Sequence, residues 1–268
     1  MLVVVSLLAV VLYVAAAYGL TKRLASFQQT DDTTIKKIVA IGLVAATLHG
    51  FVLFHALLPT AGINLGFTNV LSLATVFIAF LLIIASFNKP VENLGIIIFP
   101  LSALVLSVQV LLPTEHLLSS TETKGLGIHI VLSILAYSIL GLAAVQAVLL
   151  SLQERSLHNR KPGGIIRALP PMETMEQLLF QMLIIGFSLQ SMSLLSGFTY
   201  LEDMFAQHLV HKTVLSAIAW TVFAILLWGH WKYGWRGRTA VRWTISGFLT
   251  LLIAYFGSKY VIEILLER

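Results

Sequence analysis

The stretch LGIHIVLSILAYSILGLAAVQAVLLSL, residues 126–152, determines the class of fold. It contains no Asp, Glu, Lys or Arg, and it exceeds the roughly 20 apolar residues that a helix needs to cross a hydrocarbon core. The whole chain of 268 residues is 58% hydrophobic and 11% charged, whereas an average soluble domain carries about 25% charged residues. So few charges cannot cover a folded surface, and the sequence therefore indicates an integral membrane protein.

Seven further apolar stretches are long enough to span a membrane. Backbone groups in lipid must be paired within their own segment, which favours helices, and the short alternating segments of a β-barrel do not occur in the sequence. We predict an all-α fold, a polytopic bundle of about eight transmembrane helices in a single membrane domain, residues 1–268. The expected spans are about 2–21, 38–58, 68–87, 93–112, 126–152, 177–197, 213–231 and 243–262.

The basic residues are distributed unevenly between the two sides of this bundle. Cytoplasmic loops are enriched in Lys and Arg, and the sequence therefore predicts that both termini are periplasmic. We expect the first span to remain uncleaved, because Lys22 and Arg23 follow its apolar run instead of preceding it. The basic residues in the predicted inner loops are Lys22, Arg23, Lys36, Lys37, Lys89, Arg155, Arg160, Lys161, Arg167, Lys232, Arg236, Arg238 and Arg242, out of 17 in the chain.

Several histidines fall inside or at the outer ends of the predicted spans. An ionisable residue within a membrane is a functional hypothesis by default. The alternatives are a neutral imidazole bonded to a neighbouring helix, and an interfacial histidine among headgroups. His49 lies past the bilayer middle, and His129 opens its span at the outer face, whereas His55, His208 and His211 lie near outer span ends. His158 and His230, in inner loops, and His116, in an outer loop, are expected to be solvated.

Two histidines at one depth on separate helices suit bis-imidazole ligation of haem iron. We predict His129 and His211 as axial ligands of haem b, with His49 as a further cofactor-binding candidate. A compact Zn²⁺ or Cu²⁺ site at His208 and His211 is an alternative, but it would need more ligands, such as Glu202 and Asp203. The outer cations that could meet the haem propionates are Lys124, Lys212 and Lys259.

Parts of the sequence resemble the cytochrome c assembly (CcsA/CcmC/HemX-like) family. The stretch HIVLSILAYSILGLAAVQAVLLSLQE is similar to the family helix that begins with an outer histidine and carries a tyrosine eight residues later, here His129 and Tyr137. LLFQMLIIGFSLQSMSLLSG, residues 178–197, resembles the next helix. GWRGRTAVRWTISGFLTLLIAYFG, residues 234–257, resembles the last helix with its Gly-Trp-x-Gly turn. The nearest similarity is to the YpjD/HemX branch, which lacks the family's WWD motif.

The resemblance implies haem handling during cytochrome c assembly in a bacterial inner membrane. Its implied partners are membrane lipid, haem and other cytochrome c assembly proteins, and we expect no nucleic-acid partner. Haem-exporting members carry a tryptophan-rich outer loop, but the matching loop here, residues 199–212, has no tryptophan. The resemblance therefore favours haem binding and does not extend to presenting haem to an apocytochrome. His129 matches the family's outer histidine, whereas His211 is chosen from its position and chemistry.

Two other kinds of function stay open. The chain could be a non-catalytic regulatory or partner subunit that keeps the fold without haem. A secondary transporter is a weaker alternative, because the sequence shows no inverted repeat and no charged residue at mid-membrane. We expect no enzymatic activity, because no nucleophile and base can be placed together, and the chain has no cysteine for thiol chemistry.

Overall fold

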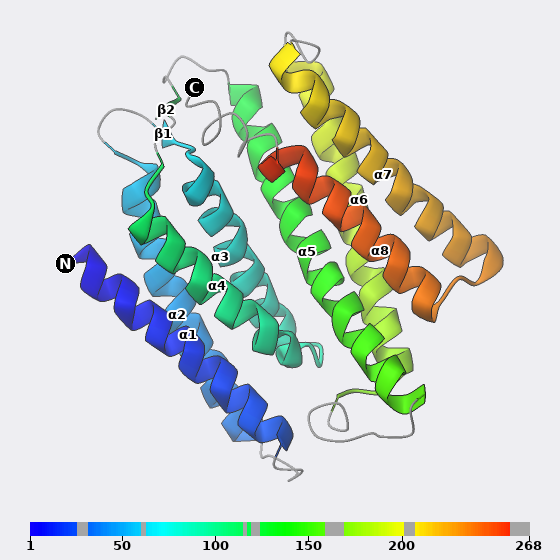
Figure 1. Cartoon of the computed structure of the whole chain (residues 1–268), viewed down its shortest axis with the longest axis horizontal. Coiled ribbons are helices and arrows are strands. Elements are labelled where there is room, and N and C mark those ends of the chain that lie inside the picture. Colours follow the sequence, from blue (N-terminus) through cyan, green and yellow to red (C-terminus); the bar gives the residue numbers. More distant parts are fainter. Residues whose placement is uncertain are drawn as a thin grey trace. The chain divides into compact units, whose positions relative to one another are not determined.

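The computed structural model describes residues 1–25, 32–59, 63–114, 117–118, 124–158, 169–200 and 207–257. Within these residues, eight helices are long and apolar enough to cross a membrane, which confirms the predicted all-α polytopic fold (Figure 1). The helices are α1 (Leu2–Ala25), α2 (Asp32–Leu57), α3 (Phe67–Ser86), α4 (Gly95–Leu111), α5 (Lys124–His158), α6 (Met172–Tyr200), α7 (Gln207–Tyr233) and α8 (Gly237–Leu252).

Several helices are longer than their predicted apolar spans. α5 has 35 residues and extends past both ends of its predicted span, 126–152. Hydropathy marks only the part of a helix that lies in hydrocarbon, whereas the helix itself continues into the polar interface. For this reason the number of spans could be predicted more reliably than their ends.

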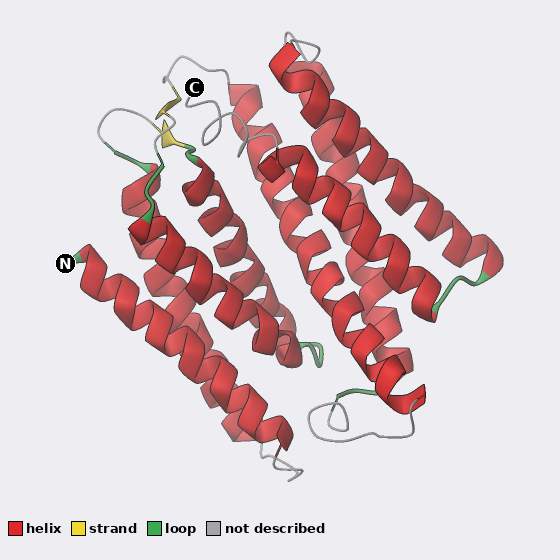
Figure 2. Ribbon diagram, viewed as in Figure 1, coloured by secondary structure: helices red, strands yellow, loops and turns green. Residues whose placement is uncertain are grey.

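Short irregular elements, which the hydropathy pattern did not predict, occur beside the long helices (Figure 2). A two-residue antiparallel pair joins β1 (Ile63–Asn64) to β2 (Leu117–Leu118). A 3₁₀ turn, η1 (Glu92–Leu94), precedes α4, and a π-helical turn, η3 (Ile253–Gly257), follows α8. These elements place loop residues at the ends of the helices, where the polar groups described below lie.

The chain divides into two compact units. Unit 1 comprises Met1–Ser120 and Leu152–Pro171, and unit 2 comprises Thr121–Ser151 and Met172–Arg268. In unit 1, α1 packs against α2 and α4, and α3 packs against α2 and α4, so that the four helices close a ring. The prediction of a single membrane domain stays a prediction.

Close helix packing in unit 1 depends on one aromatic ring and two glycines. Phe99, which is buried, faces Gly42 and Gly95, where an added Cβ would lie 2.6 Å and 2.8 Å from its ring. Tyr13 packs on the same ring with centroids 5.8 Å apart. The core of this unit is therefore filled by aromatic rings where the backbones of α2 and α4 leave room for them.

In unit 2, polar links join neighbouring helices. The indole N–H of Trp220 on α7 donates to Ser191 Oγ on α6 at 2.8 Å. The Tyr137 hydroxyl on α5 donates to the carbonyl of Leu251 on α8 at 2.8 Å, immediately before the π-helical turn. Because lipid offers no hydrogen-bond partner, such internal bonds fix which helices are neighbours.

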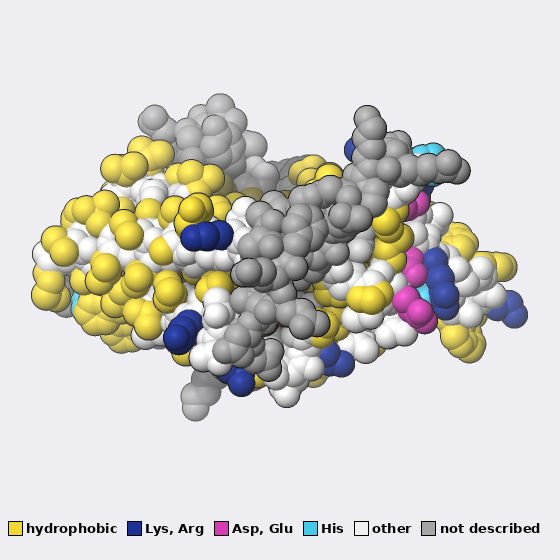
Figure 3. Space-filling view, turned by 90° about the horizontal axis from the view of Figure 1, so that it is seen from below, with side chains coloured by type: hydrophobic (Ala, Val, Ile, Leu, Met, Phe, Trp, Pro, Cys, Tyr) yellow, Lys and Arg dark blue, Asp and Glu magenta, His cyan; other side chains and the backbone are white. Residues whose placement is uncertain are grey.

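The outward faces of the helices are apolar. Val4 of α1 and Leu195 of α6 are 69% and 67% exposed, as expected for side chains that meet lipid instead of water. Figure 3 shows hydrophobic side chains over much of the visible surface, with lysine and arginine side chains among them. Lys22 and Arg23 lie in the last turn of α1, and Arg23 forms an ion pair with Glu92 of η1 at 3.2 Å.

A tight turn, residues 234–236, connects α7 to α8. Gly234 and Gly237 have positive φ angles of 68° and 52°, a region that residues with a Cβ rarely adopt. The Gly234 N–H donates to the carbonyl of His230 at 3.0 Å, which closes the end of α7. Glu176 of α6 accepts the N–H of Gly237 at 2.5 Å, so the carboxylate stabilises the first turn of α8.

Replacing Gly237 with valine should lower the yield of folded protein. A left-handed backbone costs a residue with a Cβ roughly 1–2 kcal/mol, and more if it is β-branched. The measurement is the monodisperse fraction after size-exclusion chromatography, with the exposed Thr239→Val as control. Haem spectra per folded molecule should stay unchanged. A normal yield with an altered spectrum would instead make this turn part of a site.

Candidate functional site

His129, the histidine that opened the predicted span, lies half-buried in the second turn of α5. Its ring faces α6, where it contacts Ser193 and Ser196. His129 Nδ1 lies 2.9 Å from the Ser193 carbonyl oxygen. A carbonyl oxygen can only accept a hydrogen bond, so Nδ1 carries the proton and donates it.

The neighbouring hydroxyl groups use their own hydrogens elsewhere. Ser133 donates to the carbonyl of His129 at 2.7 Å, and Ser196 donates to the carbonyl of Ser193 at 2.8 Å. The Ser133 oxygen is 3.5 Å from His129 Nε2, but its hydrogen is already engaged. His129 Nε2 therefore keeps its lone pair, and the hydrogen-bond partner that the described residues offer it is the Ser133 hydroxyl at 3.5 Å, which has closer partners at 2.7 Å in the His129 carbonyl and Ser193 Oγ.

This arrangement is the one in which a histidine binds a metal. Metal-ligating histidines usually donate their other ring N–H to a carbonyl or carboxylate, which fixes the tautomer and orients the ring. Here the Ser193 carbonyl takes that role, and α6 holds it in place. This geometry is compatible with metal ligation through Nε2, and the role of His129 as a ligand stays a prediction.

An aromatic cluster lies further along α5 in the same unit. The Tyr137 ring lies 5.9 Å from that of Tyr255 and 6.3 Å from that of Phe256, measured between ring centroids. Lys212 Nζ lies 5.7 Å from the centroid of the Tyr255 ring, a distance that allows a cation–π contact. Lys212 is the predicted propionate partner whose side chain the structure describes, and it belongs to this cluster.

The other residues predicted for the haem site lie partly or wholly outside the described part of the chain. His211 and Lys124 fall within α7 and α5, but their side chains are outside it. Lys259 is outside it altogether, as are Glu202 and Asp203, which were predicted for the alternative Zn²⁺ or Cu²⁺ site, and the side chain of His208 in that site is outside it as well. The pairing of His129 with His211 therefore stays a prediction. Within the described residues, no group of three or more His, Asp or Glu could hold a metal ion.

His49 occupies a different environment, in unit 1, where it is fully buried. Its Nε2 lies 2.6 Å from Ser72 Oγ on α3, and its Nδ1 lies 3.3 Å from the Tyr13 hydroxyl on α1. Both ring nitrogens of His49 are therefore hydrogen-bonded, whereas the Nε2 of His129 has only the 3.5 Å contact with Ser133. Ligating iron would require His49 to give up one of these bonds.

A chain of hydrogen bonds continues from His49 toward the end of unit 1. Ser72 Oγ donates to Gln109 Oε1 at 2.5 Å, and Gln109 Nε2 donates to Asn69 Oδ1 at 3.0 Å. Asn69 Nδ2 then donates to the carbonyl of Asn64 at 3.3 Å. Because the last acceptor is a carbonyl, the direction of every bond before it is fixed. His49 accordingly donates from Nε2 and accepts from Tyr13 at Nδ1.

Two further histidines have local roles. His55 is exposed, and its Nδ1 lies 3.0 Å from the Phe51 carbonyl of the same helix. His230 is not simply solvated, as the sequence had indicated, because its ring stacks on Phe180 with centroids 3.5 Å apart. His230 Nδ1 also donates to the carbonyl of Trp235 at 2.9 Å. His230 therefore helps to form the α7–α8 turn.

The serines and amides that hydrogen-bond to the two histidines, or to their partners, were not predicted from the sequence. Ser193 and Ser196 are spaced i, i+3 on α6 and lie on one face, which was the available signal. Ser72, Gln109 and Asn69 are polar residues within otherwise apolar spans, and such residues are generally paired in a membrane. The sequence could show that they need partners, but it could not show which partners they have.

Comparison with known proteins supports the resemblance stated from the sequence. The family model described as Cytochrome C assembly protein matches residues 38–266. Inner membrane protein YpjD of Escherichia coli (strain K12) is 33% identical over 226 residues, which cover 83% of this chain and 85% of the relative.

More distant relatives include Protein HemX of Brevibacillus brevis, 22% identical over 54% of each chain. Cytochrome c biogenesis protein CcsA of Gloeobacter violaceus is 24% identical over 38% of this chain and 30% of the relative. No solved structure gives a significant match. The extent of the family match, together with the similarity to YpjD, shows that this chain belongs to the cytochrome c assembly protein family.

Proposed function

We propose that this protein binds haem through His129 and acts in cytochrome c biogenesis at a bacterial inner membrane. The observation that carries the proposal is the state of the His129 ring. Nδ1–H is held by the Ser193 carbonyl at 2.9 Å, and Nε2 retains its lone pair. Family membership and the name of the E. coli relative support the cellular role and the membrane.

The remaining parts of the haem site are also proposals. We assign the second axial position to His211, which lies in the second turn of α7 as His129 lies in that of α5. Lys212, beside the Tyr255 ring, would place a cation near a propionate, and Lys124 and Lys259 are further candidates. His49 ranks last as a ligand, because both its ring nitrogens are engaged.

When bound, haem b would supply an iron centre for ligand exchange or one-electron transfer. The chain's own residues would hold and orient that iron. We propose binding and transfer to other cytochrome c assembly proteins, without enzymatic turnover. The loop that lacks tryptophan, residues 199–212, argues that any presentation to an apocytochrome belongs to a partner.

The test is the absorption spectrum of protein purified from haem-replete membranes. We expect a Soret band and about one haem per chain by pyridine haemochrome assay, as bis-imidazole ligation requires. Titrating the apoprotein in nanodiscs with defined amounts of hemin measures the same Soret band and the same number of haems per chain. Protein that stays colourless in both experiments would leave the non-catalytic partner subunit as the function.

The orientation of the chain is a further proposal, and it predicts the activity of reporter fusions. With both termini periplasmic, a C-terminal alkaline phosphatase fusion should be active, whereas a fusion after Arg167 should be inactive, because basic loops stay in the cytoplasm. Green fluorescent protein fused at the same two points should give the opposite result and serves as the control. The reverse pattern for both reporters would place His129 at the cytoplasmic face.

A further inference from the structure

Unit 1 contains a cavity of about 540 Å³ at the end where α1 begins and α2 ends. This volume is within the range of small-molecule sites, roughly 300–1,000 Å³. The cavity is lined by residues of α1, α2, α3 and α4 and by the segments around β1 and β2. It belongs to a different unit from His129, and neither the proposed function nor the family resemblance uses it.

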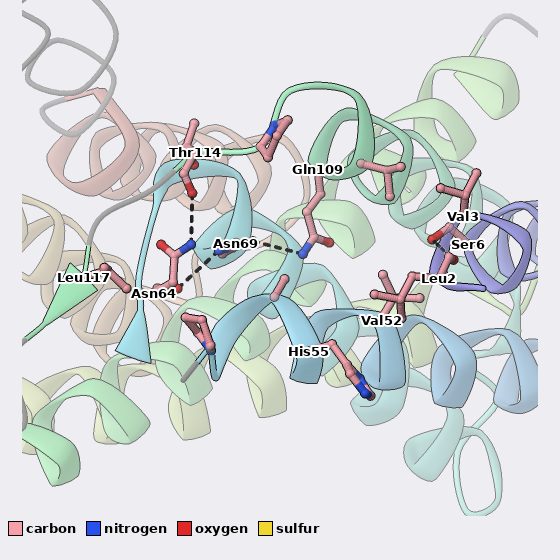
Figure 4. A pocket seen from close by; sticks show the side chains of 14 residues that line it. Leu2, Val3, Ser6, Val52, His55, Asn64, Asn69, Gln109, Thr114 and Leu117 are labelled. Carbon is pink, nitrogen blue, oxygen red and sulfur yellow. Dashed lines mark hydrogen bonds between the residues drawn. The ribbon is translucent and has the colours of Figure 1, made fainter. Parts of the chain in front are cut away.

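One end of the cavity is lined by amides and the other mainly by apolar side chains, although Leu117 lies beside the amides and Ser6 and His55 lie at the other end (Figure 4). Asn64, Asn69, Gln109 and Thr114 lie together at the polar end. Leu2, Val3 and Val52 lie away from them, near α1 and α2. Such a lining matches an amphiphile, with its head among the amides and its chain toward the surrounding lipid.

The amides at the polar end are held rigidly. Asn64 Nδ2 donates to the carbonyl of Thr114 at 3.2 Å, and Asn64 Oδ1 accepts the N–H of Gly66 at 3.0 Å. The backbone N–H of Thr68 donates to Thr114 Oγ1 at 3.0 Å. These bonds attach the start of α3 to the segment that follows α4. They therefore hold the amide donors in fixed positions.

The chain of hydrogen bonds from His49 determines which amide N–H groups of Gln109 and Asn69 are available to a ligand. Gln109 directs Oε1 toward Ser72 and uses one N–H on Asn69, while Asn69 uses one N–H on the Asn64 carbonyl. Each of these amide nitrogens keeps a second N–H that has no acceptor among the described residues. Buried donors normally find an acceptor, and an oxygen atom of a ligand would provide one.

The charge of the lining limits the ligand further. No Asp, Glu, Lys or Arg is among the described residues that line the cavity. His55 is the one titratable side chain among these described lining residues, so a charged head would find no permanently charged partner there, which makes its burial costly. Haem fits poorly for the same reason, because no lysine or arginine among the described lining residues could meet its two propionates.

We propose that this cavity binds an uncharged amphiphile whose head carries carbonyl oxygens, with Gln109 and Asn69 as the donors to those oxygens. Two membrane components have this chemistry: a neutral acylglycerol, through its esters, and an isoprenoid quinone, through its ring carbonyls. In this arrangement His49 and Ser72 act as positioning residues, because His49 bonds to Ser72 and Ser72 donates to Gln109 Oε1, which orients the Gln109 amide.

The experiment uses two photoreactive probes of equal chain length, a diazirine-bearing diacylglycerol and a diazirine-bearing decylubiquinone. Each is irradiated with the full-length protein in phosphatidylcholine nanodiscs, and the labelled residues are mapped by mass spectrometry. We expect one probe to label segments 52–59 and 109–114 about tenfold more than Met192, Leu195 and Phe198, the exposed residues of α6 that serve as the lipid-facing reference, as for a site worth about 1.4 kcal/mol over bulk lipid. The probe that labels these segments shows whether the ligand is an acylglycerol or an isoprenoid quinone.

Variants that fill the cavity test the location. Ala56→Phe on α2 and Val110→Phe on α4 each place a ring into the cavity lining, and both should reduce this labelling to the level of Met192, Leu195 and Phe198. Ala40→Phe, at an exposed position of α2, is the matched control and should label as wild type. His129→Ala should also leave labelling unchanged, which separates this site from the haem proposal.

Two results would overturn the proposal. One is equal labelling of the cavity segments in wild type, Ala56→Phe and Val110→Phe. The other is labelling by both probes no higher than at Met192, Leu195 and Phe198. In either case the amides serve only to clamp the start of α3 to the end of α4.

Discussion

Replacing His129 with alanine is expected to remove the Soret band from membranes in which the wild-type protein shows one. The substitution removes the Nε2 lone pair that the Ser193 carbonyl keeps available. Disturbing even the supporting contacts of a metal ligand commonly costs 10–100-fold in affinity. We therefore expect haem content per folded chain to fall at least about tenfold, as measured by pyridine haemochrome assay.

Three other variants make this result specific to ligation. His211→Ala should cause a comparable loss if it holds the second axial position. His55→Ala should have no effect, because His55 bonds only to the carbonyl of its own helix among the contacts described. His129→Gly should recover its Soret band when imidazole is added, since free imidazole can occupy the vacated space. Wild-type spectra for both His129→Ala and His211→Ala would show that His129 is an interfacial histidine.

The second large effect is expected at Gly186, where α6 approaches α5. An added Cβ at this position would lie 2.7 Å from Cγ and Cδ2 of Leu140 and 3.4 Å from its backbone nitrogen. Leu140 is fully buried and cannot move aside. Gly186→Val should therefore separate the two helices, at a cost of about 1–3 kcal/mol.

The measurement for Gly186→Val is thermal unfolding in detergent. A cost of this size should lower the midpoint by about 3–10 °C for a membrane domain of this length. Gly127→Val is the matched control, because an added Cβ there meets no atom within 4 Å. Haem affinity should also fall in Gly186→Val, since α6 carries the Ser193 carbonyl that orients His129. An unchanged midpoint would mean that the two helices separate without strain.

The sequence alone determined the membrane class, the number of spans and the family. These depend on local properties, because a segment such as residues 126–152 enters lipid on account of its own composition. It also singled out His129, since a histidine in an apolar span is conspicuous without any knowledge of its neighbours. The ends of the helices were less predictable, because polar turns such as those beyond residue 152 remain helical outside the hydrocarbon.

Only the tertiary structure decided how the polar residues are paired. The contact of His129 with Ser193 joins residues 64 positions apart, and that of His49 with Ser72 joins residues on different helices. The two histidines therefore differ in their surroundings: Nε2 of His129 has only a long contact to Ser133 at 3.5 Å, whereas both ring nitrogens of His49 bond to neighbouring helices. The physical reason is that a polar group in lipid must find its partner within the protein, and helix packing determines which partner is near.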